Sequence, residues 1–286
     1  MEFILGTATF GSTYGVANNG KQLSESNALN ILEKAFQWGV EVVDTSPDYA
    51  NAESIIGAFH QTDKKFRVHS KIPGKVAFNS GSILRSLESS LRRLRVDKLE
   101  VAYFHNPDSL FKYSVHEVNK VIEDIAESGM VKSLGASVYT EEEISRISRE
   151  YPTIRVFQVP ENILDQRLRE SQIVGDLKEA GCKFFVRSIF LQGLLLMNPE
   201  KLPTNLLSMR DGLNGFHEIA SSMKLSPLKA SLGYLLELHW ASGFLIGISD
   251  VNQLAEVLLA TDELPRVKLP ERITTELIDP RNWNPA

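Results

Sequence analysis

Residues 80–138 read SGSILRSLESSLRRLRVDKLEVAYFHNPDSLFKYSVHEVNKVIEDIAESGMVKSLGASV and contain the same pattern twice. A stretch with apolar residues at helical spacing, 80–94, precedes a short apolar run at 99–105. The pattern then repeats, with a helical stretch at 115–127 and an apolar run at 133–138. Near-continuous apolar runs are typical of parallel strands that are buried on both faces. These residues therefore predict helices that alternate with parallel strands.

The same alternation extends over the rest of the chain. Further strands are predicted at Phe3–Thr9, Glu41–Thr45, Arg67–Ile72, Val156–Pro160, Lys183–Ile189 and Phe244–Ile248. Further helices are predicted at Ser24–Trp38, Leu168–Ala180 and Val251–Ala260, and a fourth begins at Thr140, where Glu143 completes a capping box.

This order of elements predicts a closed barrel of eight parallel strands, the (β/α)8 or TIM barrel of the α/β class. No linker-like stretch divides the chain, so we expect one domain over residues 1–286, with a C-terminal tail from about residue 262. An open doubly wound sheet is the alternative. It usually carries a glycine-rich turn after its first strand, and Gly6 and Gly11 are too far apart for that fingerprint.

Composition narrows the class of protein. The 286 residues are 43% hydrophobic and 23% charged, as in ordinary globular proteins. The formal charge of −5 gives no basic excess for nucleic-acid binding. A single cysteine, Cys182, excludes a disulfide within the chain and any multi-cysteine zinc site, and no other metal site is predicted. No signal-peptide pattern and no long apolar run is present, so we expect a cytoplasmic protein without a membrane partner.

Four polar residues follow or lie in three consecutive predicted strands. Asp44 ends the second strand and Tyr49 follows it, Lys71 lies in the third strand, and His105 ends the fourth. In parallel barrels the functional site lies at the carboxyl ends of the strands. The quartet suits proton transfer to a carbonyl group, with Asp44 pairing Lys71 and the lysine charge making the Tyr49 hydroxyl more acidic. Taken singly, each residue also has an ordinary structural explanation, as a cap, a packed ring, a solvated lysine or a turn residue.

Several motifs resemble those of the aldo-keto reductase family. They are the first-strand segment Leu5–Gly11, the run Gly39–Tyr49 followed by Glu53 and Ile56-Gly57, the segment Leu91–His105, and the fifth-strand segment Gly129–Ser137. The likeness extends from about Phe3 to Leu259. The resemblance implies a (β/α)8 barrel that binds a nicotinamide cofactor, with Tyr49 as general acid, Asp44 and Lys71 as its tuners and His105 as the residue that orients the substrate.

The resemblance also implies the cofactor positions. Ser137 and Gln158 would hold the nicotinamide carboxamide, although Val138 stands where the family usually has asparagine. Arg187 replaces a tyrosine that stacks on the nicotinamide in many members, and a guanidinium could lie flat on that ring. The remaining predicted cofactor contacts are Ser188, Phe190, Gln192, Gly193, Gly247, Gln253 and Glu256.

The last strand departs from the family pattern in a way that concerns the choice of cofactor. Gly247 and Gln253 stand where many members carry the Lys and Arg that neutralise the 2′-phosphate of NADP. The resemblance by itself predicts NADPH, and the loss of these cations makes NADH an alternative.

The substrate is the least determined part of the sequence-based prediction. Tyr14, Asn18 and Asn106 are predicted to line its pocket, and the first two suggest a polar, sugar-like carbonyl compound. Segments 14–18 and 187–195 resemble a bacterial subgroup that is often associated with surface-polysaccharide or nucleotide-sugar pathways. Two other functions stay open: a nicotinamide-binding auxiliary barrel without turnover, and a lyase or isomerase that uses Lys71 as a Schiff-base nucleophile. The oligomeric state is not readable from the sequence.

Overall fold

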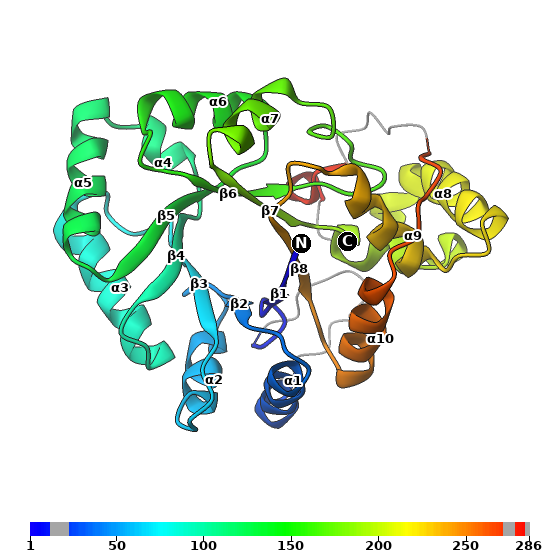
Figure 1. The fold of residues 1–286 in the computed structure, drawn as a ribbon, viewed down its shortest axis with the longest axis horizontal. Coiled ribbons are helices and arrows are strands. Elements are labelled where there is room, and N and C mark those ends of the chain that lie inside the picture. Colours follow the sequence, from blue (N-terminus) through cyan, green and yellow to red (C-terminus); the bar gives the residue numbers. More distant parts are fainter. Residues whose placement is uncertain (12–22, 271–277, 284–286) are drawn as a thin grey trace.

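The computed structural model describes residues 1–11, 23–270 and 278–283. Within these residues, eight parallel strands form a closed barrel in the order β1-β2-β3-β4-β5-β6-β7-β8, and β8 pairs with β1 (Figure 1). The predicted barrel is confirmed, and the open sheet is excluded because both edge strands are paired.

The strands occupy the positions that the apolar runs predicted, with ends that differ by up to three residues. They are β1 (Glu2–Gly6), β2 (Val42–Asp44), β3 (Arg67–Ile72), β4 (Leu99–Phe104), β5 (Val131–Ser137), β6 (Val156–Pro160), β7 (Lys183–Arg187) and β8 (Gly243–Gly247).

The helices surround the barrel (Figure 1). They are α1 (Glu25–Gln37), α2 (Ala52–Phe59), α3 (Ser80–Leu94), α4 (Asp108–Phe111), α5 (Val115–Glu127), α6 (Glu141–Glu150), α7 (Gln172–Glu179), α8 (Arg210–Ser222), α9 (Pro227–Gly233) and α10 (Val251–Asp262). Short 3₁₀ segments lie at Leu191–Leu196, Pro199–Lys201, Thr204–Met209, Tyr234–Glu237 and Pro280–Asn282.

The sequence-based prediction missed α2, α4, α8 and α9 and began α7 four residues too early. Ser171 caps α7 by accepting from the Val174 N–H, and the Leu168 N–H donates instead to the buried Glu161 carboxyl group. A contact between residues distant in the loop therefore holds residue 168 outside the helix.

Local signals fixed other helix ends correctly. The Thr140 hydroxyl accepts from the Glu143 N–H and the Glu143 carboxylate accepts from the Thr140 N–H, as the capping box predicts. Gly39 follows α1 with φ of 82°, the left-handed conformation that glycine adopts without steric cost.

The barrel separates two apolar clusters. The larger cluster packs the helices against the outer faces of the strands. The smaller cluster contains only strand residues, Ile4, Val42, Val101, Tyr103, Val156 and Phe185, as expected for side chains that fill the barrel interior. The interior is therefore closed by packing, and a ligand site has to lie at an end of the barrel.

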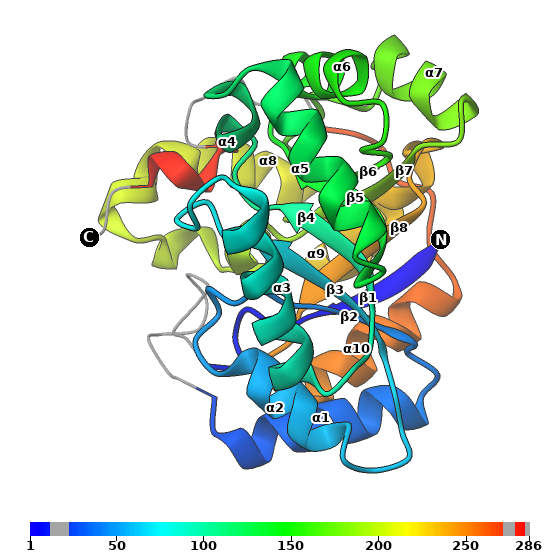
Figure 2. The same ribbon diagram turned by 90° about the vertical axis from the view of Figure 1, so that its left-hand side faces the viewer.

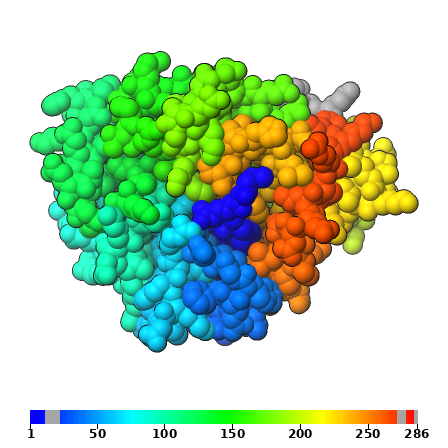
Figure 3. Space-filling view, in the orientation of Figure 1, coloured from blue at the N-terminus to red at the C-terminus, as the bar shows by residue number. Residues whose placement is uncertain are grey.

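The two ends of the barrel differ in what covers them. Figure 3 shows the N-terminal residues in the middle of the face formed by the amino ends of the strands. Figure 2 shows residues 278–283, in red, on the side of the molecule opposite the N-terminus. Among the described helices, none is both long and apolar enough to span a membrane.

Candidate active site

A cavity of about 1140 Å³ lies at the carboxyl ends of the strands. Its volume exceeds the range of about 300–1,000 Å³ that is usual for small-ligand pockets. It is lined by every predicted site residue that the structure describes: Asp44, Tyr49, Lys71, His105, Asn106, Ser137, Gln158, Arg187, Ser188, Phe190, Gln192, Gly193, Gly247, Gln253 and Glu256. Tyr14 and Asn18 lie outside the described residues. Within the described part of the chain, no cluster of His, Cys, Asp and Glu side chains is arranged to hold a metal ion.

Lys71 is the centre of a buried polar group at the bottom of this cavity. Its Nζ donates to Asp44 Oδ1 at 2.5 Å and to the Thr45 carbonyl at 2.9 Å, and it lies 5.0 Å from the centroid of the Tyr49 ring. The side chains of Lys71 and Asp44 are 2% and 3% exposed. Burial acts to lower the pKa of Lys71, but the Asp44 charge and the contacts with Asp44 and Tyr49 outweigh it and raise that pKa. Lys71 therefore stays an ammonium ion.

The pKa of the Tyr49 hydroxyl is shifted in the opposite direction from the one expected from the sequence. Burial raises its pKa, and this effect outweighs the lowering by the positive charges of Lys71 and Arg187. The expected direction of the net shift was wrong because the tyrosine is more deeply desolvated than its place in a loop suggested. Tyr49 therefore keeps its proton at neutral pH.

Asp44 also links the lysine to the next part of the site. Gln158 Nε2 donates to Asp44 Oδ2 at 2.8 Å, so both carboxylate oxygens accept a hydrogen bond. Gln158 lies beside Ser137 in the register of β5 and β6, and both side chains are buried. The Asp44 carboxylate on β2 thereby holds the side chain of Gln158, and strand register places Ser137 next to it.

His105 contacts a residue that the sequence analysis did not single out. Its Nδ1 lies 3.2 Å from Asp48 Oδ2, and Asp48 pairs with Lys75 at 2.5 Å. Burial acts to raise the pKa of Asp48, but the Lys75 and His105 contacts lower it, so the carboxylate only accepts. Nδ1 therefore carries a proton. Burial and the Lys71 charge lower the pKa of His105, which leaves Nε2 of the neutral ring as an acceptor.

Asn106 lines the cavity while its side chain has a local role. Its Oδ1 accepts from the Asp108 N–H at 2.9 Å, at the beginning of α4. Neither Asp48 nor Lys75 was predicted from the sequence as a site residue. The position of Asp48 directly before Tyr49 could have indicated its role.

The segment after β7 has an unusual backbone. Ser188, Leu191 and Gln192 have φ of 62°, 46° and 55°, and Gly193 follows with φ of 92°. Left-handed residues other than glycine cost about 1–3 kcal/mol each and concentrate at functional sites. Three of these four residues line the cavity. The strain therefore supports a ligand-binding role for this segment.

Arg187, at the end of β7, lines the cavity and contacts an aromatic ring. Its guanidinium carbon lies 4.2 Å from the centroid of the Tyr139 ring, so it stacks on an aromatic side chain of the protein itself. Its Nε is buried and has no hydrogen-bond partner among the described residues. Tyr139 was not predicted as a site residue, and neither was Arg281, whose guanidinium carbon lies 3.4 Å from the same centroid.

The end of β8 forms the far side of the cavity. The Ser249 N–H and hydroxyl both donate to Gln253 Oε1, at 3.0 and 2.8 Å, and the Asp250 carboxylate caps α10. A Cβ atom added at Gly247 would meet no atom within 4 Å, so this position opens onto free space. Among the described lining residues from β8 and α10 there is no lysine or arginine.

Comparison with known proteins agrees with this arrangement. The sequence profile of the Aldo/keto reductase family matches residues 2–267. The chain belongs to this family. Its members are oxidoreductases in general, and some serve as auxiliary subunits.

Individual relatives of this aldo-keto reductase are distant. A D-threo-aldose 1-dehydrogenase from a Pseudomonas species is 23% identical over 223 residues, which cover 66% of this chain and 68% of that protein. A rice protein named as a voltage-gated potassium channel subunit beta is 24% identical, over 91% of this chain and 88% of its own.

Solved structures extend the likeness to the fold. The crystal structure of a Pseudomonas aeruginosa protein assigned to the aldo-keto reductases superimposes with a TM-score of 0.66. It is 20% identical and covers 90% of this chain and 88% of that one. At this identity the match supports the barrel and says nothing of the substrate.

Proposed function

We propose that this protein is an NAD(P)H-dependent reductase that converts an aldehyde or ketone to an alcohol. The observation that carries the proposal is the buried pairing of Lys71 with Asp44 beside Tyr49. A protonated phenol held next to a fixed ammonium can donate its proton to a carbonyl oxygen and leave a phenolate that the ammonium stabilises.

The residues of the site divide this work. Tyr49 delivers the proton, Lys71 stabilises the charge that remains, and Asp44 holds the lysine in place. His105 binds the substrate oxygen through Nε2, as an acceptor from a hydroxyl when neutral and as a donor to a carbonyl when protonated. A reduced nicotinamide, when bound, supplies the hydride.

All of the proposed cofactor residues line the cavity. Ser137 and Gln158 would hold the carboxamide. Ser188, Phe190, Gln192 and Gly193 would line the pyrophosphate path, and Gly247, Gln253 and Glu256 the adenosine end. The volume of the cavity and the strained segment after β7 fit such a ligand.

The adenosine end bears on the choice of nicotinamide. Family resemblance favours NADPH, whose 2′-phosphate is a dianion that arginine and lysine usually bind. Here the described lining offers the carboxylate of Glu256 and the amide of Gln253 instead. These groups favour NADH, so we propose that the protein accepts NADH as well as NADPH.

The class of substrate is proposed from the relatives. One of them acts on an aldose by name, and Lys71 and His105 lie beside the Tyr49 ring in this cavity. A sugar-derived carbonyl compound therefore fits the proposal.

Nicotinamide absorbance, followed over time with purified protein and an activated aromatic aldehyde, tests the proposal. NADH and NADPH are run in parallel. Tyr49→Phe is expected to reduce turnover by about 10²–10⁴-fold, the usual size of a general-acid contribution. Tyr113→Phe removes a hydroxyl from an exposed ring and is the matched control. Full activity in Tyr49→Phe would exclude Tyr49 as the acid.

An auxiliary barrel is the second candidate function. The similarity to a protein named as a potassium channel subunit motivates it, together with the departures at Val138, Arg187 and Gly247. Cofactor binding in a fluorescence titration, without oxidation of either cofactor by any aldehyde, would favour it. The third possibility, Schiff-base chemistry at Lys71, is disfavoured because the raised pKa keeps that amine protonated.

A further inference from the structure

Two arginines share one aromatic ring at the wall of the cavity. Arg187, at the end of β7, and Arg281, near the C-terminus, have guanidinium carbons 4.2 and 3.4 Å from the centroid of Tyr139. All three residues line the cavity that contains Tyr49. The charge of Arg187 also acts on the Tyr49 hydroxyl, where it lowers the pKa against the effect of burial. The pair of arginines therefore lies on the side where a substrate would bind.

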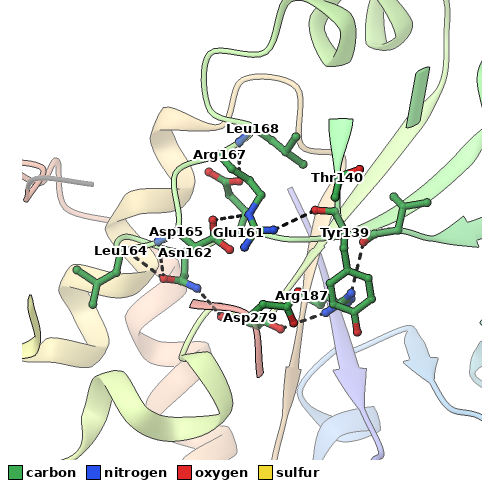
Figure 4. Close-up of polar contacts among 12 residues, drawn as sticks. Tyr139, Thr140, Glu161, Asn162, Leu164, Asp165, Arg167, Leu168, Arg187 and Asp279 are labelled. Carbon is green, nitrogen blue, oxygen red and sulfur yellow. Dashed lines mark hydrogen bonds and ion pairs between the residues drawn. The ribbon is translucent and has the colours of Figure 1, made fainter. Parts of the chain in front are cut away.

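Hydrogen bonds to both backbone polar groups of Tyr139 fix the position of this residue. The Tyr139 N–H donates to Glu143 Oε2 at 2.6 Å, and its carbonyl accepts from Arg167 Nη1 at 3.2 Å. Figure 4 shows Arg167 reaching Tyr139 from the loop after β6, where it also pairs with Asp165 at 2.7 Å. A platform that is fixed before a ligand arrives reduces the entropy lost on binding.

Arg281 is positioned by an ion pair with Asp279. Its Nε and Nη2 donate to Asp279 Oδ2 at 2.9 and 2.6 Å. This pairing orients the guanidinium over Tyr139 and leaves Nη1 for a further acceptor, because arginine has five N–H donors in a fixed plane.

Arg187 differs from the other cations of the cavity lining. Lys71 pairs with Asp44, Lys75 with Asp48 and Arg281 with Asp279. Arg187 has no carboxylate partner among the described residues. Its contacts are the Val138 carbonyl and the Ser188 hydroxyl, each at 3.4 Å, and its buried Nε has none.

We infer that Arg187 and Arg281, stacked on Tyr139, bind an anionic group of the substrate, a carboxylate or a phosphate ester on the carbonyl compound. A half-buried guanidinium without a counter-ion gains most from an acceptor that can take two of its N–H donors, and both anions can do so. The inference rests on the proposed reductase function, because it assigns the substrate of that same site.

Matched aldehydes test the inference. The probes are 4-carboxybenzaldehyde, its neutral methyl ester and 4-formylphenyl phosphate, and the measured quantity is the ratio of kcat/KM for each anion to kcat/KM for the ester. Arg187→Gln and Arg281→Gln are each expected to lower this ratio at least about tenfold, the size of a hydrogen bond to a charged group. Whichever anion shows the larger drop is the preferred class.

The ratio separates substrate recognition from cofactor binding. If Arg187 served the cofactor instead, its loss would reduce activity on the acid and the ester equally, and that result would overturn the inference. Arg92→Gln removes one positive charge from α3, outside the cavity, and is expected to leave the ratio unchanged. An equal drop in Arg92→Gln would show that only net charge matters.

Direct binding keeps the test independent of turnover. Calorimetric titration of the wild-type protein with 4-(hydroxymethyl)benzoate and with its methyl ester measures the anion preference even if no aldehyde is reduced. If the wild-type protein binds the acid more tightly than the ester, and both arginine variants lose this difference, the anion site is supported. This result does not depend on whether the proposed reductase activity is found. Equal binding of acid and ester contradicts the site.

Discussion

The two halves of the cavity wall are built on different principles. At the ends of β2, β3 and β4, the charges closest to the reaction site are paired within the protein: Lys71 with Asp44, and Asp48 with Lys75 and His105. At the ends of β5 to β8 the wall carries the strained segment after β7 and Arg187, which has no carboxylate partner among the described residues. We call these the reactive half and the recognition half.

The two halves differ in whether their charged groups are paired before a ligand binds. Charges in the reactive half must be positioned to a fraction of an ångström before a substrate arrives, so the protein itself satisfies them. Groups in the recognition half gain by staying available until a ligand binds. Motifs that resemble the family occur in both halves, whereas the departures at Val138, Arg187 and Gly247 all fall in the second.

Replacing the buried Lys71 is expected to have the largest effect on stability and turnover. Lys71→Met leaves Asp44 as an unpaired buried charge, so the free energy of unfolding is expected to fall by about 3–5 kcal/mol, and turnover by at least about a hundredfold. Urea denaturation and initial rates measure the two effects. Lys75→Met breaks the exposed pair with Asp48 and should cost no more than about 1 kcal/mol. Equal losses of unfolding free energy in Lys71→Met and Lys75→Met would contradict the burial of the Lys71 pair.

The buried Glu161, in the loop after β6, makes the stability of the folded protein sensitive to pH. Its carboxyl group accepts from Tyr234 Oη at 2.6 Å and from the Leu168 N–H at 3.0 Å, and burial raises its pKa to about 8. The folded protein therefore holds a proton that the unfolded chain releases above its ordinary pKa near 4.5. Stability falls as pH rises through this window, by up to about 1.4 kcal/mol per pH unit from this group.

Glu161→Gln is expected to flatten that slope, because the amide keeps the shape and never ionises. Thermal unfolding between pH 5 and pH 8, a window of roughly three units, measures it. Glu179→Gln, at an exposed position of α7, is the matched control and should keep the wild-type slope. An unchanged slope in Glu161→Gln would mean that this carboxyl group does not retain its proton in the folded state.

The contact between Asp48 and His105 should set one limb of the pH profile. Asp48 raises the pKa of His105 against the effects of burial and Lys71. Asp48→Asn is therefore expected to move the His105 limb of kcat/KM to lower pH by about one unit. Asp108→Asn removes an exposed carboxylate of the same cavity lining and should leave the limb in place. A shift of similar size in both variants would indicate a general field effect.

The smallest expected effect concerns the adenosine end of the recognition half. Glu256→Arg replaces a carboxylate with a cation and should improve the ratio of NADPH to NADH affinity by up to about fivefold, the size of an exposed ion pair. Fluorescence titration with each cofactor measures the ratio. Glu218→Arg makes the same charge change on α8 and should leave the ratio unchanged. An unchanged affinity ratio in Glu256→Arg would mean that the 2′-phosphate does not bind near residue 256.

The barrel, and the convergence of Asp44, Lys71 and His105 within the reactive half, could be predicted from the sequence. Buried parallel strands produce apolar runs that can be recognised locally, and Asp44, Lys71 and His105 lie at or near the ends of consecutive strands, which are neighbours in a closed barrel. Their convergence therefore follows from strand order alone. The three glycines that end α1, α5 and α7 in the left-handed conformation, Gly39, Gly129 and Gly181, were equally readable, because their φ values depend on local geometry.

The arrangement of the recognition half could not be predicted from the sequence. Tyr139, Arg167 and Arg281 come from three connections far apart in the chain, and nothing in the spacing of the sequence indicates that two guanidinium groups share one ring. The direction of the Tyr49 pKa was likewise decided by burial, which depends on everything packed around the side chain. Local periodicity encodes which strands are neighbours, whereas desolvation and the meeting of loops depend on the whole packed molecule.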